Sequence, residues 1–106
     1  MVNVEVLPSR VVRVEGSEWI KMPEDEFRLL TWFVTNPKTM MSFRDLQLEL
    51  WGFYDEQETP MLALTRMKLI RILKRICPNY NWDNVIYRDR FQGYRYAPHN
   101  VPAVQK

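Results

Sequence analysis

Basic side chains recur at helical spacing in the stretch from residue 60 to residue 76. On a helix that turns about 100° per residue, four of them gather on one side around two apolar residues. These are Lys68, Arg71, Lys74 and Arg75, with Leu64 and Met67 among them. Lys and Arg in such an array bind phosphates or guanine edges, and small apolar groups contact thymine methyls. The array therefore predicts a surface that fits the major groove of a duplex.

The opposite side of the same stretch is apolar. It carries Leu62, Leu69, Leu73 and Ile76, a spacing typical of a helix packed on a core. Two other interpretations of the basic side stay open at this point. One is the solvated face of an ordinary surface helix, and the other is an amphipathic helix for a membrane or a partner protein.

Charge is divided unevenly along the chain. Residues 1–59 hold six Lys and Arg against eleven Asp and Glu, a balance of −5, whereas residues 60–106 hold nine against two, a balance of +7. Such a division lets the basic part approach a polyanion while the acidic part opposes indiscriminate association. Arg88, Arg90 and Arg95 add to the basic part near Gly93, and an arginine in a hairpin loop is suited to a narrow minor groove.

The elements that position these residues follow from periodicity and punctuation. Alternating residues predict short antiparallel strands within residues 1–21, at Val2–Leu7, Val11–Val14 and Trp19–Ile20. Three helices are expected within residues 23–77, and Val85–Tyr87 and Tyr94–Tyr96 predict a hairpin within residues 85–97.

The helix boundaries have their own signals. Pro23 and three following carboxylates favour the start of the first helix, which ends at Asn36 and Pro37. Ser42 starts the second helix as an N-cap with Asp45 three residues on, and Gly52 ends it. The third helix begins at Thr59 and Pro60 and stops near Ile76, before Pro78. Six aromatic residues are expected in the core: Trp19, Phe27, Trp32, Phe33, Phe43 and Trp51.

Other classes of protein are disfavoured by composition. The only cysteine, Cys77, has no disulfide partner, and the chain lacks paired Cys and His spacing for zinc. The only histidine, His99, has no nucleophile or metal ligand nearby in sequence. We therefore expect that the protein is not an enzyme, and that it has no catalytic residues, no metal and no cofactor. With no secretory signal and no long apolar run, we expect a cytoplasmic protein that does not enter membranes.

The chain contains three distinctive segments: Met22–Leu30 (MPEDEFRLL), Met41–Gly52 (MSFRDLQLELWG) and Gly93–Tyr96 (GYRY). Together they resemble the OmpR/PhoB-type effector domain, a winged-helix family that binds DNA. The most specific pieces are the Trp-Gly pair that ends the second helix and the Gly-Tyr-Arg of the closing strand. The resemblance implies an α+β winged helix-turn-helix fold in residues 1–98, with N-terminal antiparallel strands, three helices and a C-terminal β-hairpin wing. Residues 99–106 are expected to form a flexible tail.

The same resemblance implies roles for particular residues. The third helix becomes the recognition helix in the major groove, Arg90 takes the place of the family's minor-groove arginine, and Trp51 and Arg88 fall where family members touch the DNA backbone. The expected contacts come from the second helix, the third helix and the wing: Ser42, Arg44, Trp51, Leu64, Thr65, Met67, Lys68, Arg71, Lys74, Arg75, Arg88 and Arg90.

The sequence departs from the family in ways that matter for the site. Phe91 stands where the wing usually has its first glycine, and the third helix aligns in two registers about one turn apart. No receiver domain is expected before the strands, which is typical of an orphan regulator or a viral one.

The function expected from sequence is a sequence-specific double-stranded DNA-binding transcriptional regulator. Its expected partners are double-stranded DNA, RNA polymerase and a second copy on repeated half-sites, and its expected place is the nucleoid. The alternative is a winged-helix module that binds RNA polymerase or another regulator, with its basic face against an acidic partner.

Overall fold

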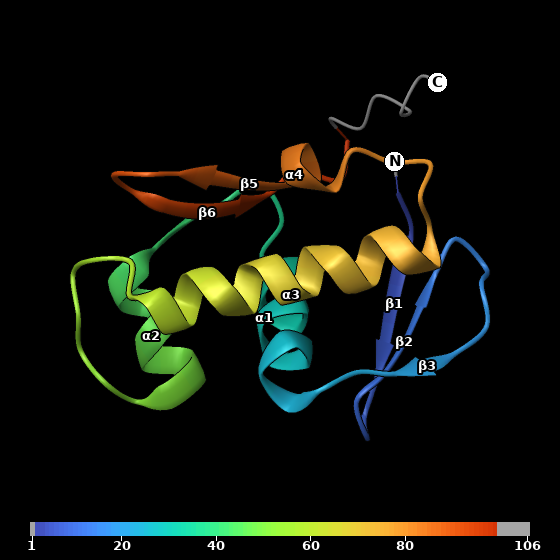
Figure 1. Cartoon of the computed structure of the whole chain (residues 1–106), viewed down its shortest axis with the longest axis horizontal. Helices are drawn as coiled ribbons and strands as arrows, with labels where there is room; N and C mark the ends of the chain where they lie inside the picture. Colours follow the sequence, from blue (N-terminus) through green and yellow to red (C-terminus); the bar gives the residue numbers. More distant parts are fainter. Residues whose placement is uncertain (1, 100–106) are drawn as a thin grey trace.

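The structure is a computed structural model that describes residues 2–99, and it consists of two small antiparallel sheets joined by helices (Figure 1). The elements are β1 (Val4–Leu7), β2 (Val11–Val14), β3 (Ile20–Lys21), α1 (Glu24–Thr35), β4 (Met40–Ser42), α2 (Phe43–Trp51), α3 (Pro60–Ile76), α4 (Trp82–Val85), β5 (Ile86–Asp89) and β6 (Gly93–Tyr96). This arrangement confirms the predicted α+β winged-helix class. Of the tail expected at residues 99–106, only His99 lies within the described residues.

The N-terminal sheet has the strand order β1-β2-β3, all antiparallel. Val12 and Val14 turn into the core from the middle strand, where both are almost fully buried. Arg13, between them, lies on the other face, because successive side chains of a strand point to opposite sides. Trp19 does not join the core as expected: it is 39% exposed, and the Arg13 guanidinium lies 4.5 Å from its ring centroid.

The three predicted helices all form, and their ends match the predicted signals. Glu24, Asp25 and Glu26 occupy the first turn of α1. The Ser42 hydroxyl accepts a hydrogen bond from the Asp45 amide at 3.0 Å, and α2 ends at Gly52 with φ at 75°. These contacts satisfy the backbone groups that a helix terminus leaves without partners.

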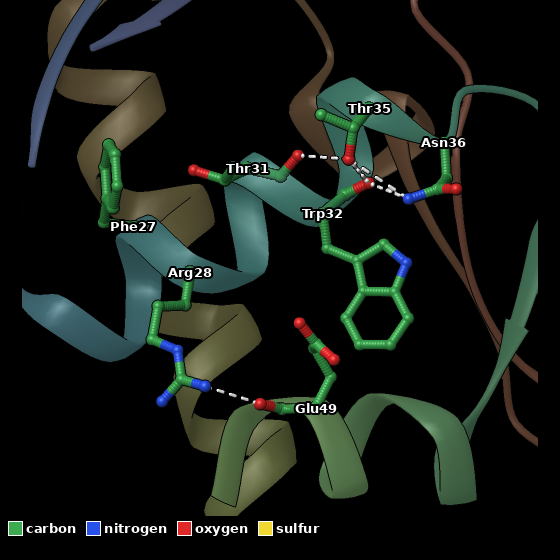
Figure 2. Close-up of a pocket in the computed structure, with 7 residues that line it drawn as sticks. All are labelled: Phe27, Arg28, Thr31, Trp32, Thr35, Asn36 and Glu49. Atoms are coloured by element: carbon green, nitrogen blue, oxygen red, sulfur yellow. Dashed lines mark hydrogen bonds between the residues drawn. The ribbon is translucent and has the colours of Figure 1, made fainter. Parts of the chain in front are cut away.

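A side chain of α1 fixes the end of α2. The Arg28 guanidinium donates to the Leu50 carbonyl at 2.7 Å. It also donates to the Glu49 carbonyl at 2.6 Å (Figure 2). A cation at this place also complements the negative end of the helix dipole. The groove beside it is lined by Phe27, Arg28, Thr31, Trp32, Thr35, Asn36 and Glu49.

The loop between α2 and α3 is held by a buried amide. Gln47 is fully buried, and its Nε2 donates to the Asp55 carbonyl at 3.2 Å and the Gln57 carbonyl at 2.9 Å. Its Oε1 accepts from the Thr59 hydroxyl at 2.5 Å. Because Thr59 is the N-cap of α3 and accepts from the Leu62 amide at 3.3 Å, this network fixes where α3 begins.

The C-terminal sheet has one strand more than predicted. Its order is β4-β6-β5, and the added strand, Met40–Ser42, pairs with β6 along Met40 to Arg95, Met41 to Tyr94 and Ser42 to Gly93. Gly93 has φ at 152°, and a Cβ there would lie 1.8 Å from the Met41 carbonyl oxygen. Glycine is needed at this position because the backbone of β4 leaves no room for a side chain.

A fourth, one-turn helix, α4, lies between the third predicted helix and the hairpin, where the sequence predicted no helix. In α4, Trp82 is completely buried, and its indole nitrogen donates to the Cys77 carbonyl at 2.8 Å. Tyr80 packs edge-on against it, with ring centroids 6.0 Å apart. Trp82 therefore joins the end of α3 to the start of β5.

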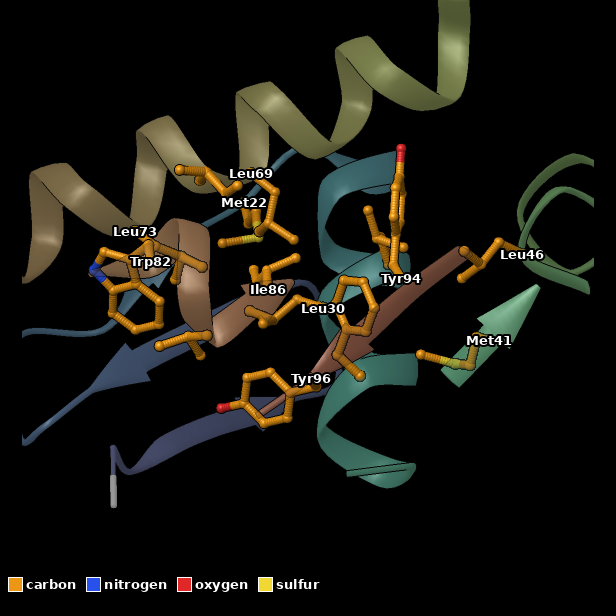
Figure 3. Close-up of a cluster of buried hydrophobic side chains, with 14 of the residues drawn as sticks. Met22, Leu30, Met41, Leu46, Leu69, Leu73, Trp82, Ile86, Tyr94 and Tyr96 are labelled. Atoms are coloured by element: carbon orange, nitrogen blue, oxygen red, sulfur yellow. The ribbon is translucent and has the colours of Figure 1, made fainter. Parts of the chain in front are cut away.

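The hydrophobic core lies between α1, α3 and the two sheets (Figure 3). Leu30 of α1 and Leu69 and Leu73 of α3 are fully buried, and Tyr94 and Tyr96 reach them from β6. Phe33 stacks on Tyr96 with ring centroids 6.2 Å apart. Burial of these side chains supplies most of the driving force that holds α3 against the rest of the molecule. Among residues 2–99, no helix is both long and apolar enough to cross a bilayer.

Candidate nucleic-acid interface

The outward face of α3 is exposed and basic, as the spacing predicted. Leu64 and Met67 are 48% and 51% exposed, while Leu62, Leu69 and Leu73 are completely buried on the inward face. The cations on the outward face are all exposed: Lys68, Arg71, Lys74 and Arg75. Figure 1 shows α3 running across the molecule in front of α1, with the β5–β6 hairpin beside it. We call these four cations, with Leu64 and Met67, the α3 outer face.

Three of the four cations have no carboxylate partner in the part of the chain that the structure describes. Within residues 2–99, Lys68, Arg71 and Arg75 form no ion pair. Lys74 differs, because its ammonium lies 3.0 Å from the Asp83 carboxylate of α4, on an exposed surface. An exposed pair of this kind contributes little to stability and exchanges readily with another anion. The α3 outer face therefore presents a dense positive potential to solvent.

Arg66 fastens the hairpin to α3, a role that the sequence did not reveal. Its Nη2 donates to the Ile86 carbonyl at 2.6 Å, and its guanidinium lies 5.5 Å from the centroid of the Tyr94 ring. Burial lowers the pKa of Arg66 from its ordinary value. The only available signal was its position on the helix, about 60° from Leu69 and so at the border of the core.

A second contact ties the hairpin to the loop before α3. The Arg88 guanidinium binds the Glu58 carboxylate at 2.6 to 3.0 Å through two nitrogens, and the buried Tyr94 hydroxyl donates to the same carboxylate. The hydrogen bonds from Arg88 lower the pKa of Glu58 from its ordinary value. Burial, and then the bond to Glu58, raise the pKa of Tyr94. We call these three residues the Glu58 latch.

The tip of the wing lies beyond the latch and is exposed. Arg90 carries the cation there, and its guanidinium lies 5.1 Å from the centroid of the Phe91 ring. Asp89 accepts hydrogen bonds from the amides of Phe91 and Gln92, at 2.9 and 3.1 Å. These bonds close the turn in the way typical of an Asx turn. Arg95, farther back on β6, lies 5.3 Å from the Tyr87 ring centroid.

The expected contacts from the second helix lie at its two ends. Ser42 is the N-cap of α2, and its hydroxyl accepts a hydrogen bond from the Asp45 amide. Arg44 is exposed, with its Nε 3.3 Å from the Asp45 carboxylate. Trp51 is half-buried and stacks on Phe53 with ring centroids 5.9 Å apart and planes 7° from parallel.

Thr65 lies away from the α3 outer face, contrary to its expected role. Its side chain is buried, at 5% exposure, and its hydroxyl donates to the Met61 carbonyl at 2.8 Å. On the helix it falls about 40° from Leu69, on the inward side. We therefore remove Thr65 from the interface.

Among residues 2–99, no group of three His, Cys, Asp or Glu side chains lies close enough together to hold a metal.

Neither a protein-family model nor a curated protein sequence matches the chain. Solved structures do match. The DNA-binding domain of Klebsiella pneumoniae RstA, solved in complex with the RstA box, is 22% identical with a TM-score of 0.72, covering 91% of this chain and 92% of that one. The DNA-binding domain of Bacillus subtilis CssR is 25% identical with a TM-score of 0.60, covering 89% and 99%. The DNA-binding domain of E. coli CadC is 15% identical with a TM-score of 0.68, covering 92% and 85%.

The chain has the winged-helix fold of OmpR/PhoB-type domains. The likeness covers 89% to 92% of the chain in these three comparisons. It confirms, at the level of fold, the resemblance that Met22–Leu30, Met41–Gly52 and Gly93–Tyr96 indicated.

Proposed function

We propose that this winged helix is a transcription regulator that binds double-stranded DNA, with α3 in the major groove and the β5–β6 hairpin beside the minor groove. The proposal is carried by one observation: three exposed cations, with no carboxylate partner among residues 2–99, surround exposed Leu64 and Met67 on the outward face of α3. A helix face that only meets solvent does not need this combination, and neither does a face that packs against the core. Neighbouring like charges without partners repel each other and lower the stability of the helix.

The dimensions of α3 fit the proposed groove. Its 17 residues span about 26 Å, and a helix with side chains is about 10 to 12 Å wide, close to the width of the major groove. Cations on both flanks of the outer face then reach the phosphates of the two strands, and Leu64 and Met67 lie nearest the bases. Phosphate contacts position the helix, and contacts to base edges select the sequence.

The hairpin is held where it extends this footprint. Arg66 binds the start of β5, and the Glu58 latch binds Arg88 to the loop before α3. In Figure 1 the β5–β6 hairpin lies beside the N-terminal half of α3. The RstA domain of the same fold was solved in complex with its RstA box, which supports a duplex as the ligand.

Selection of bound duplexes from a random pool tests the proposal. We expect enrichment of one motif, with duplicated half-sites if two copies bind side by side. The affinity for the selected duplex should fall steeply with added salt, because bound phosphates release counterions. The alternative partner is RNA polymerase or another regulator. Recovery of no enriched motif, together with salt-insensitive or undetectable duplex binding, would contradict the proposal and favour that alternative.

A further inference from the structure

Phe91 is the most exposed large hydrophobic side chain within residues 2–99. Its exposed fraction is 83%, against 62% for Tyr54, the next highest. An exposed phenyl ring at the end of a hairpin adds nothing to the core, and it gains free energy only when something covers it. The ring therefore identifies the wing tip as a contact point.

Three kinds of contact hold the backbone that carries Phe91. The Asp89 carboxylate accepts hydrogen bonds from the Phe91 and Gln92 amides at 2.9 and 3.1 Å. Strand pairing continues to the pair Asp89 and Gly93 at the base of the turn. Gly93 in turn lies directly against the Met41 carbonyl of β4. A ring on such a turn loses little further backbone freedom on binding. Less of the free energy gained by burying it is therefore offset by lost conformational entropy.

A cation lies next to the ring. The Arg90 guanidinium is 5.1 Å from the ring centroid, so one tip presents both a positive charge and a flat apolar group. The minor groove of duplex DNA accepts this combination, since arginine is drawn to its negative potential and an apolar wedge separates neighbouring base pairs. A surface of another protein would require an apolar pocket beside a carboxylate.

We propose that the Phe91 ring inserts between two base pairs of the minor groove next to the α3 site and partly unstacks them. Arg90 holds the tip at the groove while the ring opens the step. Pyrimidine–purine steps take the ring most readily, because they unstack at the lowest cost. The inference rests on the proposed function, because it needs α3 to set the hairpin on a duplex.

Base unstacking provides a direct readout. The full chain is titrated with the duplex recovered by selection, in which 2-aminopurine replaces one flanking adenine at a time, since this base brightens when it loses its stacking neighbour. We expect the fluorescence to rise at one step with the wild-type chain. The rise should be lost with Phe91→Ala and kept with Phe91→Leu, which is also an apolar wedge.

The matched control removes another exposed aromatic ring. Trp19→Ala, at the N-terminal sheet, should leave the fluorescence rise unchanged. Phe91→Ala should also weaken binding to the selected duplex about tenfold, the effect of losing one aromatic contact to a base. Far-ultraviolet circular dichroism of each variant checks that the hairpin still folds.

The outcomes separate this inference from the proposed function. Tight duplex binding without a fluorescence rise at any position would overturn the wedge and leave DNA binding standing. A rise that persists in Phe91→Ala would overturn the assignment to this residue. Cooperative binding that falls in Phe91→Ala, with no unstacking, would overturn the wedge in favour of a contact between two copies. If no duplex is bound at all, both proposals are wrong.

Discussion

The α3 helix and the β5–β6 hairpin are both rich in cations, but the cations are used differently. On α3, Lys68, Arg71 and Arg75 extend into solvent without a carboxylate among the described residues. On the hairpin, Arg88 is bound by Glu58 at 2.6 Å, and Arg90 and Arg95 lie against aromatic rings. The helix supplies free charge, whereas on the hairpin the charge of Arg88 is bound internally and helps to fix the position of the hairpin.

We therefore expect the unpaired cations of α3 to set the affinity for DNA, and the internally bound charge to set the position of the hairpin. Charge that has no internal partner is available to phosphates, so removing it should weaken binding without unfolding the chain. Charge that is held internally orients the element that carries it, so removing it should loosen the hairpin first. The first predictions below concern how the hairpin is held and what its tip does, from the largest expected effect to the smallest, and the closing measurement concerns the free charge of α3.

Gly93→Ala should produce the largest loss. The added Cβ would lie 1.8 Å from the Met41 carbonyl, so β4 and β6 must separate, and we expect a loss of about 3 to 5 kcal/mol in the free energy of unfolding. Urea denaturation measures it. Gly16→Ala is the control, because Gly16 also has a positive φ, 73°, but has no atom within 4 Å of its added Cβ. That control should lose only about 1 kcal/mol, and equal losses would show that the contact with β4 is unimportant.

Glu58→Gln should have the next largest effect, on the hairpin. The Glu58 side chain is only 11% exposed and binds both Arg88 and Tyr94, so replacing its charge should lower the free energy of unfolding by about 1 to 2 kcal/mol. Amide exchange should increase in β5 and β6 more than in α3. Asp83→Asn, which removes an exposed partner of Lys74, should change stability by about 0.5 kcal/mol or less. A larger loss for Asp83→Asn than for Glu58→Gln would show that the Lys74–Asp83 pair, and not the Arg88–Glu58 pair, is the more stabilising one.

The contribution of Glu58 should depend on pH. Because Arg88 holds the pKa of Glu58 below its ordinary value of about 4.5, the unfolded chain binds more protons than the folded chain in mild acid. The stabilisation is therefore complete above the unfolded pKa and is lost as the pH falls through the folded one. The difference in unfolding free energy between wild type and Glu58→Gln should stay constant from pH 7 to about pH 5 and then close. A difference that is unchanged at pH 3 would exclude the ion pair as its source.

Arg90→Ala should have the smallest effect, and one that depends on the flanking sequence. If the tip enters a minor groove, the loss of affinity should be greater on duplexes with A·T-rich flanks, where the groove is narrow and its potential deeper. Fluorescence anisotropy on two duplexes that differ only in their flanks measures this. An equal loss on both duplexes would assign Arg90 to a phosphate.

Local patterns in the sequence predicted the helices and the α3 outer face well. Ser42, Thr59 and Pro60 are strong boundary signals, and the spacing of Leu62, Leu69 and Leu73 fixed which side of α3 turns inward. These features depend on neighbours within a few residues of one another. A single sequence is therefore enough to establish them.

Contacts between distant segments could not be predicted in the same way. The strand Met40–Ser42 has only 3 residues and forms because β6 pairs with it. Glu58 and Arg88 are 30 positions apart, and Arg66 reaches a carbonyl 20 positions away. Nothing in the local pattern marks these partners. Thr65 was misplaced for a different reason, because its position about 40° from Leu69 on the helix already indicated the inward side, where its hydroxyl donates to the nearby Met61 carbonyl.

The salt dependence of duplex binding by a charge-removed α3 tests the central claim most directly. The variant changes Lys68, Arg71 and Arg75 to Gln, and the matched control changes Arg10, Arg13 and Lys38, which lie outside α3 and the hairpin, to Gln. We predict that the α3 variant binds the selected duplex on the order of a hundredfold more weakly, with the slope of log affinity against log salt smaller by about 3, and that the control keeps the wild-type slope. An unchanged slope in the α3 variant, or an equal change in the control, would contradict the account.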